Sequence, residues 1–387
     1  MYNKKKIPWK RTALIFTLCT LMSLAFVFAL AGCGGSQDTP VVEEDPEETE
    51  AGLKIIIVTS GSNVDDGSFN QNNYEGILDF IKNNPEATVN TTQSTDIADS
   101  MNDVDSVLAD YDVIVLPGFQ FASVSTRAVD NPEKYFILVD TDPAPVDDQT
   151  VFDNIYAMTF KEQESGFFAG IAAALETQTG KVAFVGGMAF PPVVNYQFGF
   201  EAGVNYANLN LGTDVKLVNV AAYAGTDVTN TNVGGNYVQD FGDEATGKVI
   251  GDTLIAQGCD IIFVAAGASG NGVFTAAKEA GTLVIGCDVD QFDDGAYAGG
   301  NVVLTSVFKN MRINVTRSLV DIKGGTFRGG NYLLGADTDS TGYVSATGRH
   351  QMSEDTLEAL ADAFAKLKSG EIVPPGNFAP GNIERAQ

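Results

Sequence analysis

Short apolar runs rich in β-branched residues recur along the chain and constrain its fold more than any other feature. Most runs are unbroken rather than alternating, end at turn residues, and are separated by segments with helical spacing, such as residues 165–175 and 195–207. Strands of this kind are buried on both faces of a parallel sheet. The runs are residues 53–58, 113–116, 136–139, 182–185, 217–220, 261–264, 283–285 and 302–304. The repeated strand–helix pattern therefore predicts an α/β fold with helices on both faces of a parallel sheet.

The pattern occurs twice, which predicts two doubly wound lobes. The first block covers residues 53–160, and a second begins near residue 180 with a strand, the glycine pair 186–187 and a helix. A chain of 387 residues is long enough for two such cores. Ligands of doubly wound sheets bind outside the carboxyl ends of the strands. We therefore expect a ligand in a cleft between the lobes, with closure of the lobes as the moving part.

The first 32 residues have the features of a secretion signal. Five Lys and Arg residues precede an apolar run over residues 12–30, and the small residues Ala31 and Gly32 precede Cys33. This pattern resembles the lipobox of bacterial lipoproteins. The run alone could also span a bilayer as an uncleaved anchor. We favour cleavage and lipidation of Cys33, which would anchor the protein on the extracytoplasmic face of the cell membrane.

Charge and cysteine content narrow the possible partners. Residues 33–52 are expected to form an acidic, solvated tether, since residues 37–52 contain seven acids and no aromatic residue. The formal net charge of −27 excludes nucleic acid as a natural partner. Cys19 would leave with the signal, and Cys259 and Cys287 flank different predicted strands, so we expect both as buried thiols rather than a disulfide.

The segment after the first strand combines acids with an aromatic residue. Ser68 and Gln71 match a capping box, which predicts a helix from Phe69. The acids at residues 65–66 are favourable beside a helix N-terminus, which explains them without a ligand. Phe69 in the first turn would face the strand ends, where it could stack on a flat ligand or serve as a local hydrophobic staple. Asn70 offers a hydrogen-bond donor and an acceptor beside it.

Residues that can hold a polar ligand follow several other strands. Asp140 follows the run 136–139, Asp288 follows 283–285, and the small residues 265–272 follow 261–264. A carboxylate can accept two hydrogen bonds from a vicinal diol, as in ribose, and small residues let backbone amides approach a ligand. Each acid alone could be a cap or a surface charge. Their convergence on one sheet edge favours a binding site.

A set of short motifs, taken together and in order, resembles the basic membrane protein family of purine-nucleoside-binding lipoproteins, which serve as receptors of ABC importers. The motifs span residues 53 to about 322. They are residues 66–71 with Glu75 and Gly76, 117–119, 136–140, 164–170 with Ala172 and Ala173, 185–187, 199–200 with 202–204, 266–267 with 272–273, 285–288 with Asp290 and Gln291, and Ser306 with Lys309.

The resemblance implies a periplasmic-binding-protein fold of type I, with two lobes joined by three crossovers. Lobe 1 would contain residues 53–160 and about 298–323, and lobe 2 residues 161–297 and about 324–387. It implies a monomeric receptor that delivers a nucleoside to an ABC permease, with no cofactor, metal or catalysis. The resemblance also assigns roles in the cleft: stacking to Phe69 and Phe263, ribose or base-edge contacts to Asp140 and Asp288, a place near the ligand to Lys309, pocket lining to Phe241 and backbone contact to Gly267.

Two departures from the family pattern bear on the ligand and on the site residues. Ser60 stands where the family often has an aspartate, and a hydroxyl carries no charge, so the purine preference stays open. Residues 224–238 form a segment that is longer and richer in Asn, Thr and Gly than the family pattern suggests, which bears on the assignment of Phe241. A sugar or another small solute remains an alternative ligand, because this fold hosts many ligands. A surface lipoprotein that imports nothing is a further alternative.

An enzyme is the less favoured alternative. Residues 288–294 resemble the acidic cluster with which nucleoside hydrolases hold calcium, but here the cluster follows a late strand rather than the first. The single histidine, His350, lies in a polar segment, and the chain has no nucleophile elbow, phosphate-binding loop or zinc ligand set. The tail contains a strand-like stretch at 332–335 and a helix at 353–368, expected to pack on the second lobe.

Overall fold

The computed structural model describes residues 52–386. The predicted signal, the lipidation at Cys33 and nearly all of the tether lie outside these residues. The described residues form one compact unit. Within the described residues, no helix combines the length and the apolar character needed to cross a bilayer.

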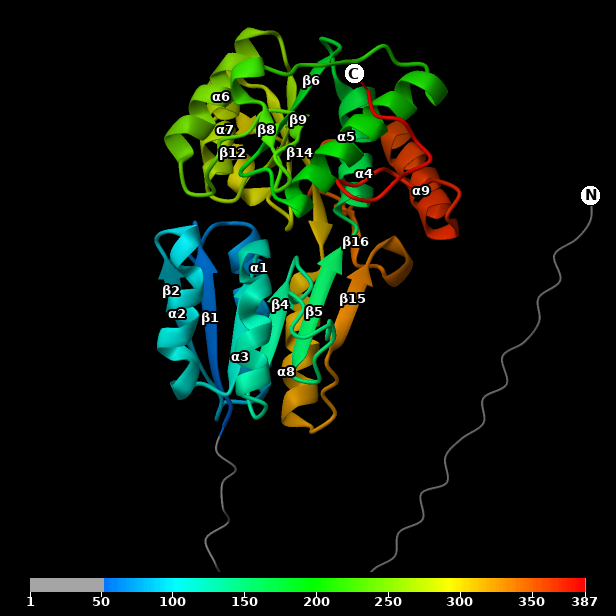
Figure 1. The fold of residues 1–387 in the computed structure, drawn as a ribbon. Coiled ribbons are helices and arrows are strands. Elements are labelled where there is room, and N and C mark those ends of the chain that lie inside the picture. Colours follow the sequence, from blue (N-terminus) through cyan, green and yellow to red (C-terminus); the bar gives the residue numbers. More distant parts are fainter. Residues whose placement is uncertain (1–51, 387) are drawn as a thin grey trace, which may run out of the picture. The chain divides into compact units, whose positions relative to one another are not determined.

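The first sheet contains six parallel strands in the order β15-β5-β4-β3-β1-β2 (Figure 1). Its strands are β1 (Lys54–Ser60), β2 (Thr88–Ser94), β3 (Val113–Pro117), β4 (Tyr135–Val139), β5 (Ile155–Phe160) and β15 (Gly330–Leu334). Successive residues of β1 enter opposite cores, as the two-residue strand period requires. Ile55 and Ile57 pack under α1 (Phe69–Asn83) and α8 (Met311–Lys323), whereas Ile56 and Val58 pack under α2 (Ser100–Val107) and α3 (Ser125–Asp130).

The second sheet has the order β16-β14-β11-β10-β6-β7. Its strands are β6 (Lys181–Gly186), β7 (Lys216–Leu217), β10 (Ile261–Ala265), β11 (Leu283–Gly286), β14 (Val303–Lys309) and β16 (Thr341–Tyr343), and only β16 runs antiparallel to its neighbour. One face is covered by α4 (Glu162–Glu176), α5 (Pro191–Asn210) and α9 (Glu354–Ser369), the other by α6 (Glu244–Ala256) and α7 (Ser269–Ala280).

Shorter elements connect the two sheets and their helices. They are β8 (Gly225–Thr226), β9 (Asn232–Gly234), β12 (Ala296–Tyr297), β13 (Gly300–Asn301) and the 3-10 helices η1 (Ile97–Asp99), η2 (Leu108–Asp110), η3 (Phe119–Val124), η4 (Ala221–Tyr223), η5 (Asp293–Gly295) and η6 (Ala336–Thr338). The predicted tail helix is confirmed as α9, which starts where the Ser353 hydroxyl accepts a hydrogen bond from the Thr356 amide. Buried residues of α9 join the core of the second lobe, as expected.

The chain passes between the sheets three times, after β5, β14 and β15. The predicted fold of two α/β lobes joined by three crossovers is therefore confirmed. The predicted lobe boundaries need correction at two places, because β14 belongs to the second sheet and β15 to the first. The second crossover lies at Asn310, after the buried strand β14 has paired with β11, and not near residue 298. An apolar run in the sequence does not reveal which of two sheets it will join.

Glycines of the family-like motifs allow α4 and α5 to cross closely. A Cβ on Gly166 or Gly170 would lie 2.2 Å from a backbone oxygen of α5, and one on Gly199 or Gly203 would lie 2.1 or 2.2 Å from a backbone oxygen of α4. No residue larger than glycine fits such an approach without moving a helix. This crossing fixes α4 and α5 against each other, and α5 contributes side chains to the cleft described next.

Candidate ligand-binding cleft

The carboxyl ends of strands from both sheets meet around a cleft of about 690 Å³, a volume that includes its open mouth. Strands β1, β3 and β4 contribute from lobe 1, and β10, β11 and β14 from lobe 2. Eight of the predicted site residues line the cleft: Ser60, Phe69, Asn70, Asp140, Phe241, Gly267, Asp288 and Lys309.

Phe263 does not line the cleft, so its predicted role is corrected. Its side chain is fully buried inside lobe 2, with ring centroids 5.5–5.8 Å from those of Phe184, Tyr196 and Phe200. Phe263 is the middle residue of β10, whereas ligand contacts in such sheets come from residues at or beyond the strand ends. Phe263 therefore supports Tyr196 from behind rather than stacking on a ligand.

Helix α1 begins at Phe69 as predicted, but its cap is Asp66 and not a Ser68–Gln71 capping box. The Asp66 carboxylate accepts hydrogen bonds from the backbone amides of Ser68, Asn70 and Gln71 at 2.9–3.1 Å, while Ser68 makes no side-chain cap. Burial raises the pKa of Asp66, opposed by these three amides. Asp66 thus fixes the turn that presents Phe69 to the cleft.

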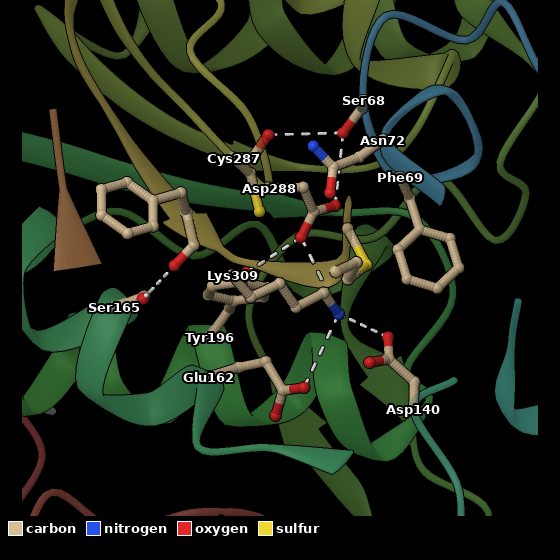
Figure 2. A network of polar contacts seen from close by, with 12 residues as sticks. Ser68, Phe69, Asn72, Asp140, Glu162, Ser165, Tyr196, Cys287, Asp288 and Lys309 are labelled. Carbon is tan, nitrogen blue, oxygen red and sulfur yellow. Dashed lines mark hydrogen bonds and ion pairs between the residues drawn. The ribbon is translucent and has the colours of Figure 1, made fainter. Parts of the chain in front are cut away.

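A buried lysine joins three carboxylates, two of which, Asp140 and Asp288, line the cleft. Figure 2 shows Lys309 from the end of β14 pointing toward Asp140, Glu162 and Asp288. Its ammonium forms a close ion pair with Asp140 and lies 3.6 Å from Glu162 and 3.8 Å from Asp288. Burial opposes the charge on Lys309, but the three acids outweigh it and raise its pKa. The ammonium also lies 4.7 Å from the centroid of the Phe69 ring, within cation–π range.

Glu162 is a member of this cluster that the sequence analysis missed. It is the first residue of α4, and its carboxylate accepts a hydrogen bond from the Asn195 side chain at 2.9 Å. Burial raises the pKa of Glu162 to about 8, against the opposing charge of Lys309. This shift favours the neutral carboxyl group over the carboxylate, which lowers the negative charge of the cluster.

We expect Glu162→Gln to remove a pH dependence of stability. The native pKa of about 8 exceeds the ordinary 4.5, so the native state retains a proton that the unfolded state releases, and wild-type stability falls as pH rises between these values. The variant should unfold at similar urea concentrations near pH 5 and be more stable than wild type by roughly 3–5 kcal/mol near pH 8.5. The exposed Glu358→Gln serves as the control. If the stability of wild type and of Glu162→Gln changed with pH in parallel, the raised pKa of Glu162 would be refuted.

The two carboxylates that follow strands share an unusual backbone conformation but differ in their partners. Asp140 has a φ of 65° and Asp288 a φ of 68°, in the left-handed region that few non-glycine residues adopt. Within the described residues, Asp140 Oδ1 is buried without a hydrogen-bond partner. Both oxygens of Asp288 are engaged, Oδ1 by the Tyr196 hydroxyl at 2.9 Å and Oδ2 by the Ser68 hydroxyl at 3.2 Å. Of these two carboxylates, Asp140 is therefore the one with an oxygen, Oδ1, that is free to accept a hydrogen bond from a ligand.

Gln120 lines the cleft and was also missed by the sequence analysis. Its side-chain amide donates a hydrogen bond to Ser60 Oγ at 2.5 Å. The side chain folds back over Gly118, whose φ of 134° and lack of a Cβ make room for it. A hydroxyl paired with a neutral amide thus occupies the edge of the cleft where the resemblance led us to look for an aspartate.

Aromatic rings continue across the cleft from one lobe to the other. Phe119 of lobe 1 lies 5.8 Å from Phe190 of lobe 2, centroid to centroid, and Phe190 lies 6.0 Å from Phe241. All three side chains line the cleft. Together with Phe69 they give the cleft several apolar faces beside its charged centre.

The residues weighed for an enzymatic role make other contacts. Asp290 and Asp293 form ion pairs with Arg349, at 2.7 Å and 2.8 Å, so these carboxylates are already neutralised by a side chain. His350 accepts a hydrogen bond from the Met352 amide and is not among the residues lining the cleft. Cys259 and Cys287 are confirmed as buried free thiols. These contacts give the calcium-dependent hydrolase no support.

Comparison with known proteins identifies the family. The model of the Bmp family, described as ABC transporter substrate-binding protein PnrA-like, matches residues 53–227 and 221–375. The chain belongs to the Bmp family. This Bmp protein is 31% identical to the CD4+ T-cell-stimulating antigen of Listeria innocua, over 95% of the chain and 99% of that protein. It is also 31% identical to the ABC transporter nucleoside-binding protein BmpA of Lactococcus lactis, over 92% and 97% of the two chains.

Solved structures agree on the fold. A crystal structure of ABC transporter solute-binding proteins from Aeropyrum pernix matches this Bmp protein with a TM-score of 0.69 and 24% identity, over 84% of this chain and 94% of that one. As an ABC transporter substrate-binding protein, this Bmp protein binds a solute and works with a transporter permease. Its family consists of extracytoplasmic, membrane-associated receptors rather than enzymes.

Proposed function

We propose that this Bmp protein binds a nucleoside in the cleft and delivers it to an ABC permease. The observation that carries the proposal is the buried, unpartnered Asp140 Oδ1, in a cleft that is also lined by the Phe69 ring. A nucleoside matches both features, because its hydroxyls and ring N–H groups donate hydrogen bonds and its base presents a flat face. The printed name of the Lactococcus lactis relative, an ABC transporter nucleoside-binding protein, supports the same ligand class.

Asp140 is the expected primary acceptor for the ligand. A buried acceptor left unpaired costs free energy, which a ligand donor would recover on binding. Asp288 would contribute less directly, since Tyr196 and Ser68 already donate to its two oxygens. Burial raises the pKa of Asp140, and the neighbouring charge of Lys309 opposes this rise and favours the ionised carboxylate, which accepts hydrogen bonds.

The pairing of Ser60 with Gln120 bears on which base is bound. An aspartate at this edge could only accept hydrogen bonds, whereas the Ser60–Gln120 pair offers a hydroxyl donor and an amide acceptor. Both groups are neutral, so they suit a base edge that presents an acceptor beside a donor, and they do not restrict the ligand to purines. Sugars are the competing ligand class, since aromatic faces and carboxylates suit them as well.

Phe69→Ala is expected to weaken nucleoside binding by about 1–3 kcal/mol, the usual contribution of an aromatic ring stacked on a base. Calorimetric titration of residues 50–387 with inosine and cytidine measures the loss. Phe69→Leu is the matched variant, because it keeps apolar volume but has no aromatic face, and it should recover only part of the affinity. Unchanged affinity for both nucleosides in the alanine variant would remove Phe69 from the site.

The proposal also covers the membrane anchor and the oligomeric state of the receptor. We expect a lipid on Cys33 and a monomer that presents one cleft to the permease. The intact mass of protein extracted from membranes tests the lipid, and an unmodified, uncleaved N-terminus would contradict it. Light scattering on residues 50–387 tests the monomer, and a concentration-independent dimer mass would contradict that part.

A further inference from the structure

Ser68 connects the two lobes from a position outside the cleft. It precedes α1 of lobe 1, and its hydroxyl lies 3.2 Å from Asp288 Oδ2 and 3.4 Å from the backbone oxygen of Cys287, both in lobe 2 (Figure 2). Its side chain is buried, yet Ser68 is not one of the residues that line the cleft. Since Asp66 caps α1, the Ser68 hydroxyl is left free to make this contact between lobes.

Gln291 makes a second contact at the same place. Its side-chain amide nitrogen, Nε2, donates a hydrogen bond to the backbone oxygen of Gly67 in lobe 1 at 3.2 Å. Its side-chain oxygen accepts from the Cys287 amide at 2.9 Å, and its own backbone amide donates to Ser306 Oγ at 3.0 Å. Lobe 2 therefore holds Gln291 rigidly in the orientation that meets lobe 1.

Asp288 joins these contacts to the ligand site. The oxygen that does not face Ser68 accepts from the Tyr196 hydroxyl at 2.9 Å and lies 3.8 Å from the Lys309 ammonium. Tyr196, Lys309 and Asp288 all line the cleft, whereas Ser68 and Gln291 do not. One carboxylate thus contacts the cleft with one oxygen and lobe 1 with the other.

We propose that Ser68 and Gln291 form an interlobe latch that holds the closed state, and that Asp288 couples this latch to the ligand cleft. Ser68 is then a positioning residue for ligand retention, with no ligand contact of its own. Separation of the lobes would break both latch contacts and expose one side of Asp288. The proposal depends on the chain being a solute receptor and not on the identity of the solute.

The latch has a defined energetic consequence. A hydrogen bond to a charged acceptor such as Asp288 contributes enough to change an equilibrium by about tenfold or more. The apparent affinity of a receptor scales with the fraction of molecules that reach the binding-competent, closed state. Loss of the latch should therefore speed ligand release, while entry into the open cleft is unaffected.

Ser68→Ala is the direct test, with Ser94→Ala as its matched control. Ser94 is also a buried serine whose hydroxyl donates to an aspartate, Asp103, at 2.5 Å, but both residues lie within lobe 1. Stopped-flow measurements with inosine should give a dissociation rate about tenfold faster for Ser68→Ala, with unchanged association. Ser68→Thr, which keeps the hydroxyl, should stay near wild type. Gln291→Glu, which keeps the acceptor for Cys287 but loses the donor to Gly67, should also release faster.

A distance measurement makes the test independent of the ligand. Spin labels on Ser106→Cys in α2 and Val249→Cys in α6 report on the separation of the lobes, and the native thiols in residues 50–387 are buried. Ser68→Ala should shift the distance distribution, in free or nucleoside-saturated protein, toward the open state relative to Ser94→Ala. Identical distributions for both variants in both conditions, or equal acceleration of release by Ser94→Ala, would overturn the latch.

Discussion

Replacing Lys309 with methionine is expected to lower the free energy of unfolding by about 3–5 kcal/mol at pH 7.5. Lys309 is only 2% exposed, and it is the cation that Asp140, Glu162 and Asp288 share. Without it, buried carboxylates lose their counter-charge while their desolvation cost remains. Because the pKa of Lys309 is raised above 10.5, its stabilisation is present throughout the neutral range and is lost only at higher pH.

The loss in Lys309→Met should shrink as pH falls, because the unpaired carboxylates can then take up protons in the native state. Urea unfolding at pH 5 and pH 8 measures the difference. Lys248→Met is the matched control, since Lys248 also contacts two acids, Asp252 and Glu279, both at 2.9 Å, but at the surface. The Lys248→Met substitution should lower the free energy of unfolding by less than about 1 kcal/mol. A similar loss in both variants at both pH values would show that the cluster is not an electrostatic unit.

Asp140→Asn is expected to weaken nucleoside binding by about 10–100-fold, the usual worth of a charged hydrogen-bond acceptor. Asparagine tolerates the left-handed backbone conformation at this position, so the strand end should keep its shape. The exposed Asp142→Asn, two residues further on, is the control and should bind as wild type. Calorimetric titration with inosine measures both. Full affinity in a folded Asp140→Asn protein would exclude the Asp140 carboxylate as the ligand acceptor.

Much of the fold was predictable because its signals are local. Buried parallel strands read as continuous apolar runs, and β1, β3, β4, β6, β10 and β11 were predicted in this way. β2 was missed because its sequence, Thr-Val-Asn-Thr-Thr-Gln-Ser, is that of a polar edge strand with a largely exposed surface. The placement of β14 and β15 was missed for a different reason. Which sheet a strand joins depends on the crossovers, and these are contacts between distant parts of the chain.

The site residues likewise divide into those with a local sequence signal and those without one. Asp140 and Asp288 were identifiable because each directly follows a predicted strand, and parallel strands present their carboxyl ends at one edge. Glu162, Tyr196 and Gln120 follow no such rule, since a helix start, a helix interior and a 3-10 helix bring them in. The assignment of Phe263 was wrong because Phe263 lies in the middle of β10 and not at its end. A residue in the middle of a buried strand packs into the core, however suitable its ring is for stacking.

The central claim, that the cleft binds a nucleoside, is tested most directly by isothermal titration of residues 50–387. The panel is inosine, guanosine, adenosine, cytidine, uridine and ribose, each with and without calcium. We predict one-to-one binding of at least one nucleoside, independent of calcium and without release of free base. The relative affinities would show whether Ser60 and Gln120 admit pyrimidines. Absence of binding across all five nucleosides, or cleavage to free base that requires calcium, would contradict the proposed function.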